Sequence, residues 1–401
     1  MAKRRGKGEG CISKRKDKNG KVVGWCAVTT GGINPKTGKT KQVLLYGKTR
    51  EEVQEKLIKA LAEKQAGVFV EPSKLKVGDW LDKWLNDRMK NHLRPTTWDS
   101  YKYLIDTHIK PAICNLQLKN LTSTHPHDLY NAKIAGGRSD GAGGLSSRTV
   151  RYIHTVIHAA LKQAVREGLL AQNVVDNVVI PKQHKKEMRV LTREETERFL
   201  TAIENDRLYA AFLLDLTSGL RVGELLALRW KDVDLKEGII HVRRGLVKIR
   251  NQEGETKTKT AFHEPKSKQG KRDIPIPEDV VKELRAHRAR QNQEKLLLGQ
   301  EYQDNDLVFC TVDGKPIEPR NFTRTFHRMI KKAGIPHANL HALRHTYATR
   351  LLEANEHPKV VQELLGHSQI SMTLDTYSHV GMDLKRKAAE KLAGLVKEKA
   401  W

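Results

Sequence analysis

Three separate stretches in the second half of the chain place cationic, imidazole or phenol side chains beside glycine turns. In the first, Thr217–Glu224, Arg221 follows the tight turn at Ser218-Gly219 and opens a predicted helix. A cation at that end of a helix opposes the helix dipole, so presenting the guanidinium to an anion explains Arg221 better than a structural role. Glu224 could orient this guanidinium from behind, and a surface ion pair is the alternative.

The second stretch, Pro265–Arg272, is a cation-rich hairpin that precedes a strand-like segment, Asp273–Pro277. A solvated basic turn is the ordinary interpretation of such a hairpin. Contact with a polyanion such as DNA is the functional alternative. The basic side chains that could reach DNA are those of Lys266, Lys268, Lys271 and Arg272.

The third stretch begins with HALRHTYAT, in which His341 and Arg344 lie three residues apart and therefore on one helix face. Further on, Gly366 is expected to end a helix and to place His367 in a loop, and Tyr377 follows ten residues later. Each of these residues taken alone could have an ordinary structural role, and a tyrosine usually contributes to packing. Their occurrence together is harder to explain without chemistry.

Two motifs suggest other chemistry and are set aside. His341 and His345 have the spacing of two metal ligands, but the glutamate of a zinc hydrolase is missing and Arg344 between them would repel a cation. The segment GGINPKTGKT resembles a phosphate-binding loop, yet Ile33 stands where that motif needs glycine. We expect a polar hairpin loop there and no metal site.

The ordered set SGLRVGE, PKSKQGKR, HALRHTYAT and LGHSQISMTLDTY resembles the signature of tyrosine recombinases of the phage and conjugative-element integrase family. The resemblance makes Arg221 and Arg344 the clamp on a scissile phosphate and Tyr377 the nucleophile. Two forked guanidiniums match the non-bridging oxygens and can replace a metal ion. Because a 3′-phosphotyrosine link retains the ester bond energy, neither a nucleotide nor a metal cofactor is expected.

The resemblance also implies roles for three further residues. Lys266 would be the general acid that protonates the leaving 5′-oxygen, although Lys268 lies only two residues away and hairpin length varies in the family. His341 would act as a base or a phosphate ligand, and His367 would donate a further hydrogen bond. A free tyrosine has a pKa near 10, so cationic neighbours that favour the phenolate would activate the nucleophile.

The N-terminal part, residues 1–67, is expected to form a small α+β module. Residues 1–48 carry 13 Lys and Arg against 2 acids. Turns are expected at Asn19-Gly20 and Gly31-Gly32, and a helix capped by Thr49 should seat Val53, Leu57, Leu61 and Ile58 on the sheet. A disordered basic tail is the alternative. The expected strands and helix are Cys11–Lys14, Trp25–Thr30, Gln42–Tyr46 and Thr49–Gln65.

Residues 74–180 read as an all-helical domain. One helix face should carry Val77, Trp80, Leu81 and Trp84, and a second helix should be capped by Thr96 with Asp99 at the capping-box position. Residues 120–145 look irregular, with a flexible glycine-rich loop, and a strong helix should span Ser147–Glu167. In the resembling family, this layout corresponds to a core-binding domain and the N-terminal module to an arm-binding domain.

After a basic linker at Pro181–Glu187, residues 188–401 mix helices with short strands and begin with a capping box at Thr192 and Glu195. A tail helix is expected over Leu384–Ala400. The resemblance implies that this part is a mixed α/β, mainly α, catalytic domain of the DNA breaking-rejoining type. It also implies that the tail helix packs on a neighbouring subunit and so links a homo-tetramer on two DNA duplexes. Docking of the tail on its own domain is the alternative.

The formal net charge of +26 favours a polyanionic partner, because neutralising phosphates releases their counterions. Four scattered cysteines and the lack of a secretion signal or membrane span suggest the bacterial cytoplasm, near the nucleoid. The expected partners are core-type and arm-type sites on double-stranded DNA, with a possible excisionase-type directionality factor. The alternatives are a type IB topoisomerase and a non-catalytic DNA-binding accessory protein.

Overall fold

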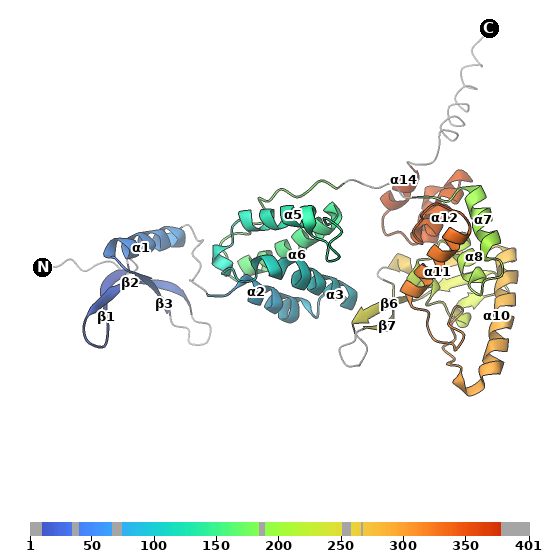
Figure 1. Cartoon of the computed structure of the whole chain (residues 1–401), viewed down its shortest axis with the longest axis horizontal. Helices are drawn as coiled ribbons and strands as arrows, with labels where there is room; N and C mark the ends of the chain where they lie inside the picture. Colours follow the sequence, from blue (N-terminus) through green and yellow to red (C-terminus); the bar gives the residue numbers. More distant parts are fainter. Residues whose placement is uncertain are drawn as a thin grey trace, which may run out of the picture. The chain divides into compact units, whose positions relative to one another are not determined.

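The computed structural model describes residues 10–33, 40–65, 74–183, 189–250, 258–265 and 268–377. The chain divides into two compact units, Met1–Lys185 and Lys186–Trp401, and each is described by itself. Figure 1 shows the elements of both units along the chain. The predicted tail helix and Lys266 lie outside the described residues, as does most of the predicted linker at Pro181–Glu187.

The first unit begins with an antiparallel sheet of order β1-β2-β3 and one helix. Thr49 caps this helix, since its Oγ1 accepts a hydrogen bond from the Glu52 amide at 3.2 Å. Val53 and Leu57 are buried against Ala27 of the sheet. The predicted three-strand-plus-helix module is therefore confirmed. Its elements are β1 Cys11–Lys16, β2 Val22–Ile33, β3 Thr40–Gly47 and α1 Arg50–Gln65.

Two details of this module differ from expectation. Gly31 and Gly32 do not form a turn but lie within β2, because pairing with β3 resumes at Ile33 after a register irregularity. Ile58 is 59% exposed and does not join the stripe on the sheet. Its helix position is one step beyond Leu57, which turns the side chain away from the buried face.

A helical bundle forms the rest of the first unit. Its single core includes Trp80 and Trp84, and the Trp80 Nε1 donates to the Ala160 carbonyl at 3.0 Å. The bundle contains α2 Val77–Lys83, η1 Trp84–Met89, α3 Pro95–Leu104, η2 Ile105–Ile109, α4 Lys110–Ile113, η3 Leu118–Asn120, α5 Thr124–Gly136 and α6 Ser147–Arg166.

Two expectations for the bundle were wrong. Helix α3 begins at Pro95 with Arg94 before it, so Thr96 lies inside the helix and caps nothing. Proline at the first helical position has its φ already set for a helix, which moves the start ahead of Thr96. The segment 120–145, expected to be less regular, contains α5, which buries Leu129 and Tyr130 in the core, and the glycine-rich stretch after this helix lacks helix and strand.

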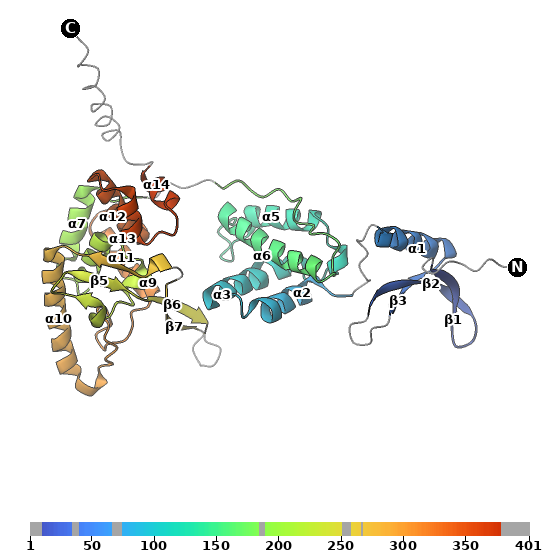
Figure 2. The same ribbon diagram turned by 180° about the vertical axis from the view of Figure 1, so that it is seen from behind.

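The second unit is mainly helical and has two small antiparallel sheets, β4-β5-β8 and β6-β7. The capping box of Thr192 and Glu195 is present. Strands β6 and β7 form a hairpin that extends from the body of the unit (Figure 2). The helices are α7 Arg193–Ile203, α8 Tyr209–Ser218, α9 Val222–Leu225, η4 Trp230–Asp232, η5 Lys268–Gly270, α10 Glu278–Leu298, η6 Gly299–Glu301, α11 Pro319–Lys332, α12 His341–Glu353, α13 Pro358–Leu365 and α14 Ser371–Tyr377. The strands are β4 Val233–Asp234, β5 Ile239–Val242, β6 Gly245–Arg250, β7 Thr258–His263 and β8 Arg272–Pro275.

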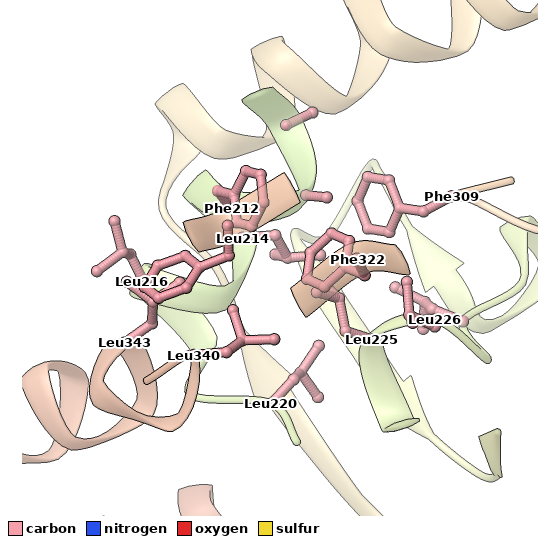
Figure 3. Packing of buried hydrophobic residues seen from close by; sticks show 14 of the residues in the cluster. Phe212, Leu214, Leu216, Leu220, Leu225, Leu226, Phe309, Phe322, Leu340 and Leu343 are labelled. Carbon is pink, nitrogen blue, oxygen red and sulfur yellow. The ribbon is translucent and has the colours of Figure 1, made fainter. Parts of the chain in front are cut away.

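Helix α8 runs through the core of this unit. Its Phe212 stacks on Phe322 of α11 with ring centroids 4.7 Å apart, and Leu214, Leu216 and Leu343 belong to the same buried cluster (Figure 3). A helix fixed on its buried side holds the turn at its C-terminus rigidly. Within the described part of the chain, no helix is both long and apolar enough to cross a membrane.

Candidate active site

Arg221 is placed by the turn that ends α8. Gly219 adopts a left-handed conformation (φ 58°), and a Cβ there would lie 2.4 Å from the Tyr347 ring. Only glycine fits such a turn. Arg221 then precedes α9, and its NH1 donates to Glu224 Oε1 at 2.7 Å while NH2 donates to the Gly366 carbonyl at 3.1 Å. Its side chain is 41% exposed and can meet a ligand in solvent.

Arg344 lies on α12 and is only 3% exposed. Its NH1 donates to the Gly219 carbonyl, and its NH2 donates to the Leu365 carbonyl at 2.6 Å. Burial, with Arg221 nearby, lowers the pKa of Arg344 to about 9, so the group remains charged at neutral pH. Since Leu365 and Gly366 are consecutive, Arg344 and Arg221 converge on one turn of the backbone.

Glu224 is the carboxylate that organises this cluster, as the sequence suggested. It is 9% exposed, and its Oε2 accepts hydrogen bonds from the Arg221 amide at 3.0 Å and from Arg272 NH2 at 2.9 Å. Burial alone would raise the pKa of Glu224, but Arg272 and Arg221 outweigh burial and lower it. Glu224 is therefore ionised and bridges two arginines.

Arg272 corrects one of the sequence-based expectations. It was grouped with the basic side chains that could reach DNA, but its side chain is only 6% exposed. Arg272 and buried Ile274 lie two residues apart along β8, with exposed Asp273 between them, and this period of two places Arg272 on the inner face. That alternation was the available signal. Lys271, the residue before it, is exposed and pairs with Glu264.

The histidines lie beside the same two arginines. His341 is the first residue of α12, and its ring meets that of His345 edge-on at 4.7 Å. Burial, followed by Arg344 and Arg221, lowers the pKa of His341 below its usual range. His367 follows the left-handed Gly366, as expected, and its Nδ1 is 3.0 Å from Thr373 Oγ1. Burial and the same arginines lower the pKa of His367 to about 4. Both imidazoles are therefore neutral at pH 7.

Asp215 of α8 is a buried acid that sequence reasoning missed. It is 2% exposed, and among the described residues its Oδ1 has no hydrogen-bond partner. Burial raises its pKa to about 8, although the nearby Arg344 opposes that rise. Asp215 therefore holds its proton much more readily than a free aspartate, which weakens its ability to cancel the positive charge of the neighbouring arginines. Its place in the apolar stretch AFLLDLTS gave no sign of this neighbour.

The remaining predicted residues are only partly described. Tyr377 is the last residue of α14, which packs against α12 and α13, but its side chain lies outside the described residues. Lys266 lies outside them entirely, and for Lys268 only the backbone in η5 is described. The structure thus brings together Arg221, Arg344, His341 and His367, and it ends α14 at Tyr377. The catalytic roles of all six stay predictions.

Comparison with known proteins identifies the family. The model of the "Phage integrase family" matches residues 189–383, and that of the "Phage integrase, N-terminal SAM-like domain" matches residues 76–134. A "Tyrosine recombinase XerC-like" protein of Caldanaerobacter subterraneus subsp. tengcongensis is 34% identical over 94% of this chain and 97% of its own length. The ICEBs1 integrase of Bacillus subtilis is 27% identical over 76% of this chain and 79% of its own.

Solved structures share the fold. The Tn1549 transposon integrase in complex with transposon right-end DNA superposes with a TM-score of 0.65 at 24% identity, over 79% of this chain and 99% of that one. A lambda integrase dimer bound to a core site gives 0.54 at 20% identity, over 90% and 93%. This chain belongs to the phage integrase family of tyrosine recombinases. It is a tyrosine-type site-specific recombinase of a mobile element, an enzyme that breaks and rejoins DNA.

Proposed function

We propose that this recombinase integrates and excises its element through a 3′-phosphotyrosine at Tyr377. The observation that supports this most is the convergence of Arg221 and Arg344 on the consecutive carbonyls of Gly366 and Leu365 at the C-terminal end of α13, next to the helix that ends at Tyr377. Two fixed guanidiniums match the oxygens of a phosphodiester, where negative charge grows in the transition state.

The proposed reaction balances without a cofactor. The Tyr377 phenol oxygen attacks the phosphorus and loses its proton to His341, whose lowered pKa leaves a neutral imidazole able to accept it. The bond from phosphorus to the 5′-oxygen breaks, and Lys266 or Lys268 protonates that oxygen. His367 donates a hydrogen bond to the phosphate. A 5′-hydroxyl from the second duplex then attacks the phosphotyrosine and reverses each step.

We expect joining of two duplexes to need neither metal nor nucleotide. The test mixes the purified chain with two labelled duplexes carrying the crossover sites, in excess EDTA and without ATP. Recombinant strands should form as fast as in magnesium buffer. A parallel reaction contains a supercoiled plasmid. A type IB topoisomerase would relax this plasmid but would not join the two duplexes, and a non-catalytic accessory protein would bind DNA without cutting it. Either result, or a strict need for metal, would contradict the proposal.

We propose further that the three parts of the chain have separate tasks, with residues 1–67 binding arm-type sites, residues 74–180 and 188–401 binding core sites, and the last part cutting. The N-terminal sheet supports this. Lys14 lies over the Trp25 ring at 5.5 Å on the face of the sheet that packs against α1. Arg15 lies over the Tyr46 ring at 5.4 Å on the opposite face, where Tyr46 is 50% exposed, so this face presents a cation beside an aromatic ring. Such a surface suits a phosphate backbone.

Deleting residues 1–66 tests this division. Binding to an arm-site duplex should weaken, and the slope of log affinity against log salt should flatten, because fewer phosphates are neutralised. Cleavage of a core-site duplex should stay within about twofold, since no described residue of the site lies in the deleted segment. The readouts are a salt titration by anisotropy and a single-turnover cleavage assay. Equal loss of cleavage would contradict the division.

The proposal extends to assembly and place of action. Lambda integrase has been solved as a tetramer bound to a Holliday junction, and it shares this fold with a TM-score of 0.54 at 20% identity. We propose that this chain likewise acts as a homo-tetramer on two duplexes, in the bacterial cytoplasm at the nucleoid. An excisionase-type directionality factor would set the balance between integration and excision.

A further inference from the structure

The C-terminal turn of α13 holds three arginines on three consecutive backbone carbonyls. The last carbonyls of a helix lack partners within it and carry its negative dipole end, so cations bind there favourably. The acceptors come from a single turn, whereas the donors come from β8, α12 and the residue before α9. The pairs are Arg272 Nε with Leu364 at 2.7 Å, Arg344 NH2 with Leu365 at 2.6 Å and Arg221 NH2 with Gly366 at 3.1 Å.

Each nitrogen of the Arg272 guanidinium has an acceptor among the described residues: the Leu364 carbonyl for Nε, the Gly270 carbonyl for NH1 at 3.4 Å and Glu224 for NH2. The side chain of Arg272 is 6% exposed, and its NH2 is committed to Glu224 Oε2 at 2.9 Å. It is also packed against the turn, because a Cβ on Gly366 would lie 3.1 Å from the Arg272 Cδ and 2.7 Å from the Gln269 carbonyl. The Arg272 guanidinium is therefore much less accessible to a phosphate than that of Arg221, whose side chain is 41% exposed.

The contacts of Arg272 lead to Arg221 by two routes. Through Glu224, Arg272 shares a carboxylate whose other oxygen accepts from Arg221 NH1 at 2.7 Å. Through α13, it fixes the carbonyl two residues before the one that holds Arg221 NH2. Without Arg272, the buried carboxylate of Glu224 would keep one cationic partner, and its full charge would draw Arg221 back from the ligand.

We propose that Arg272 is a positioning residue for Arg221, acting through Glu224 and the C-terminal turn of α13. It sets the guanidinium of Arg221 where the non-bridging oxygens of the scissile phosphate arrive. The inference rests on the proposed role of Arg221 as a phosphate clamp. Small displacements of a clamp are costly, since an error of about 1 Å can lower a rate by about 10²-fold.

The test uses the Arg272→Gln variant and three nicked duplexes that differ only at the scissile position. One has the natural phosphate. One has a methylphosphonate, which lacks a charged non-bridging oxygen, so its rate of cleavage depends less on stabilisation by the two arginines. The third has sulfur as the bridging 5′-atom, a leaving group that needs no general acid. Single-turnover adduct formation should fall about 10²-fold on phosphate and on the sulfur duplex. On methylphosphonate the variant should stay within about threefold of the parent.

Arg207→Gln is the matched control. Arg207 also joins a glutamate and a backbone carbonyl, those of Glu294 and Cys310, and within the described part of the chain its hydrogen bonds involve no residue of the site. It should lower the thermal midpoint as much as Arg272→Gln does while keeping the adduct rate on phosphate within about twofold. The Arg272→Lys variant keeps the positive charge but not the planar guanidinium, so its rate of adduct formation should lie between those of the parent and of Arg272→Gln.

Three results would overturn the inference. Rescue by bridging sulfur would mean that Arg272 positions the general acid instead. Equal loss on all three duplexes, or an equal loss in Arg207→Gln, would mean that it only stabilises the fold. An unchanged rate on phosphate would mean that it does neither. A parent chain that forms no adduct on any duplex would overturn the proposed function, and this inference with it, so the two failures are distinguishable.

Discussion

Replacing Tyr377 by phenylalanine is expected to abolish the covalent protein–DNA adduct and to leave DNA affinity unchanged. The substitution removes one oxygen at the end of α14 and keeps the aromatic ring, so the helix packing on α12 and α13 should persist. The measurement is denaturing electrophoresis after incubation with a nicked duplex, on which the cleaved strand cannot be rejoined. Affinity is measured in parallel by anisotropy on an intact duplex.

Tyr347→Phe is the control for this prediction. Tyr347 lies on α12 close to the arginines, and a Cβ on Gly219 would clash with its ring. Burial raises the pKa of Tyr347, which makes its phenol a poor nucleophile. This variant should form the adduct at a rate within about twofold of the parent. Adduct formation by Tyr377→Phe, or its loss in Tyr347→Phe, would show that the nucleophile is assigned wrongly.

Arg344→Lys is expected to lower the rate of adduct formation by about 10²–10³-fold, the range seen when one fixed donor to a developing charge is removed. Lysine keeps the charge but cannot span the carbonyls of Gly219 and Leu365 as the guanidinium does. One buried carbonyl would lose its partner, so the unfolding free energy should also fall by about 1–3 kcal/mol. Single-turnover kinetics and thermal unfolding measure the two effects.

The Arg350→Lys variant is the control that distinguishes a loss of function at the site from a general loss of stability of α12. Arg350 lies on the same helix as Arg344, pairs with Glu353 and donates to the Leu191 carbonyl at 2.8 Å. This variant should keep the adduct rate within about threefold, whatever stability it loses. If Arg344→Lys cut as fast as the parent, or if both variants lost activity alike, Arg344 would not be part of a phosphate clamp.

Local signals predicted the main elements well. The strands of the N-terminal module, the helix Ser147–Arg166 and the capping box at Thr192 all follow from turn, cap and periodicity rules. Where prediction failed, a competing local rule applied. Pro95 started α3 ahead of the expected cap, and β2 continued through Gly31-Gly32 because pairing with β3 resumed beyond them.

The site was predicted by residue type but not by its supporting contacts. Motif spacing gave Arg221, Glu224 and Arg344, and the pairing of Arg221 with Glu224 is present. We did not infer from the sequence that Arg272 is buried, although its spacing from Ile274 indicated it, and no pattern in the sequence indicated that Asp215 lies near Arg344. These relations join segments far apart in the chain. Backbone carbonyls hold all three arginines, and because every residue has one, a sequence does not show which carbonyl will accept a hydrogen bond.

Strand cleavage should join DNA to Tyr377 itself. The direct measurement is to trap the adduct of the parent chain on a nicked duplex, digest it with nuclease and trypsin, and locate the added phosphonucleotide by mass spectrometry. We expect the modification on the tryptic peptide Val360–Lys385, whose single tyrosine is Tyr377. A phosphonucleotide on any other residue, such as Tyr347 in the peptide His345–Arg350, would contradict it.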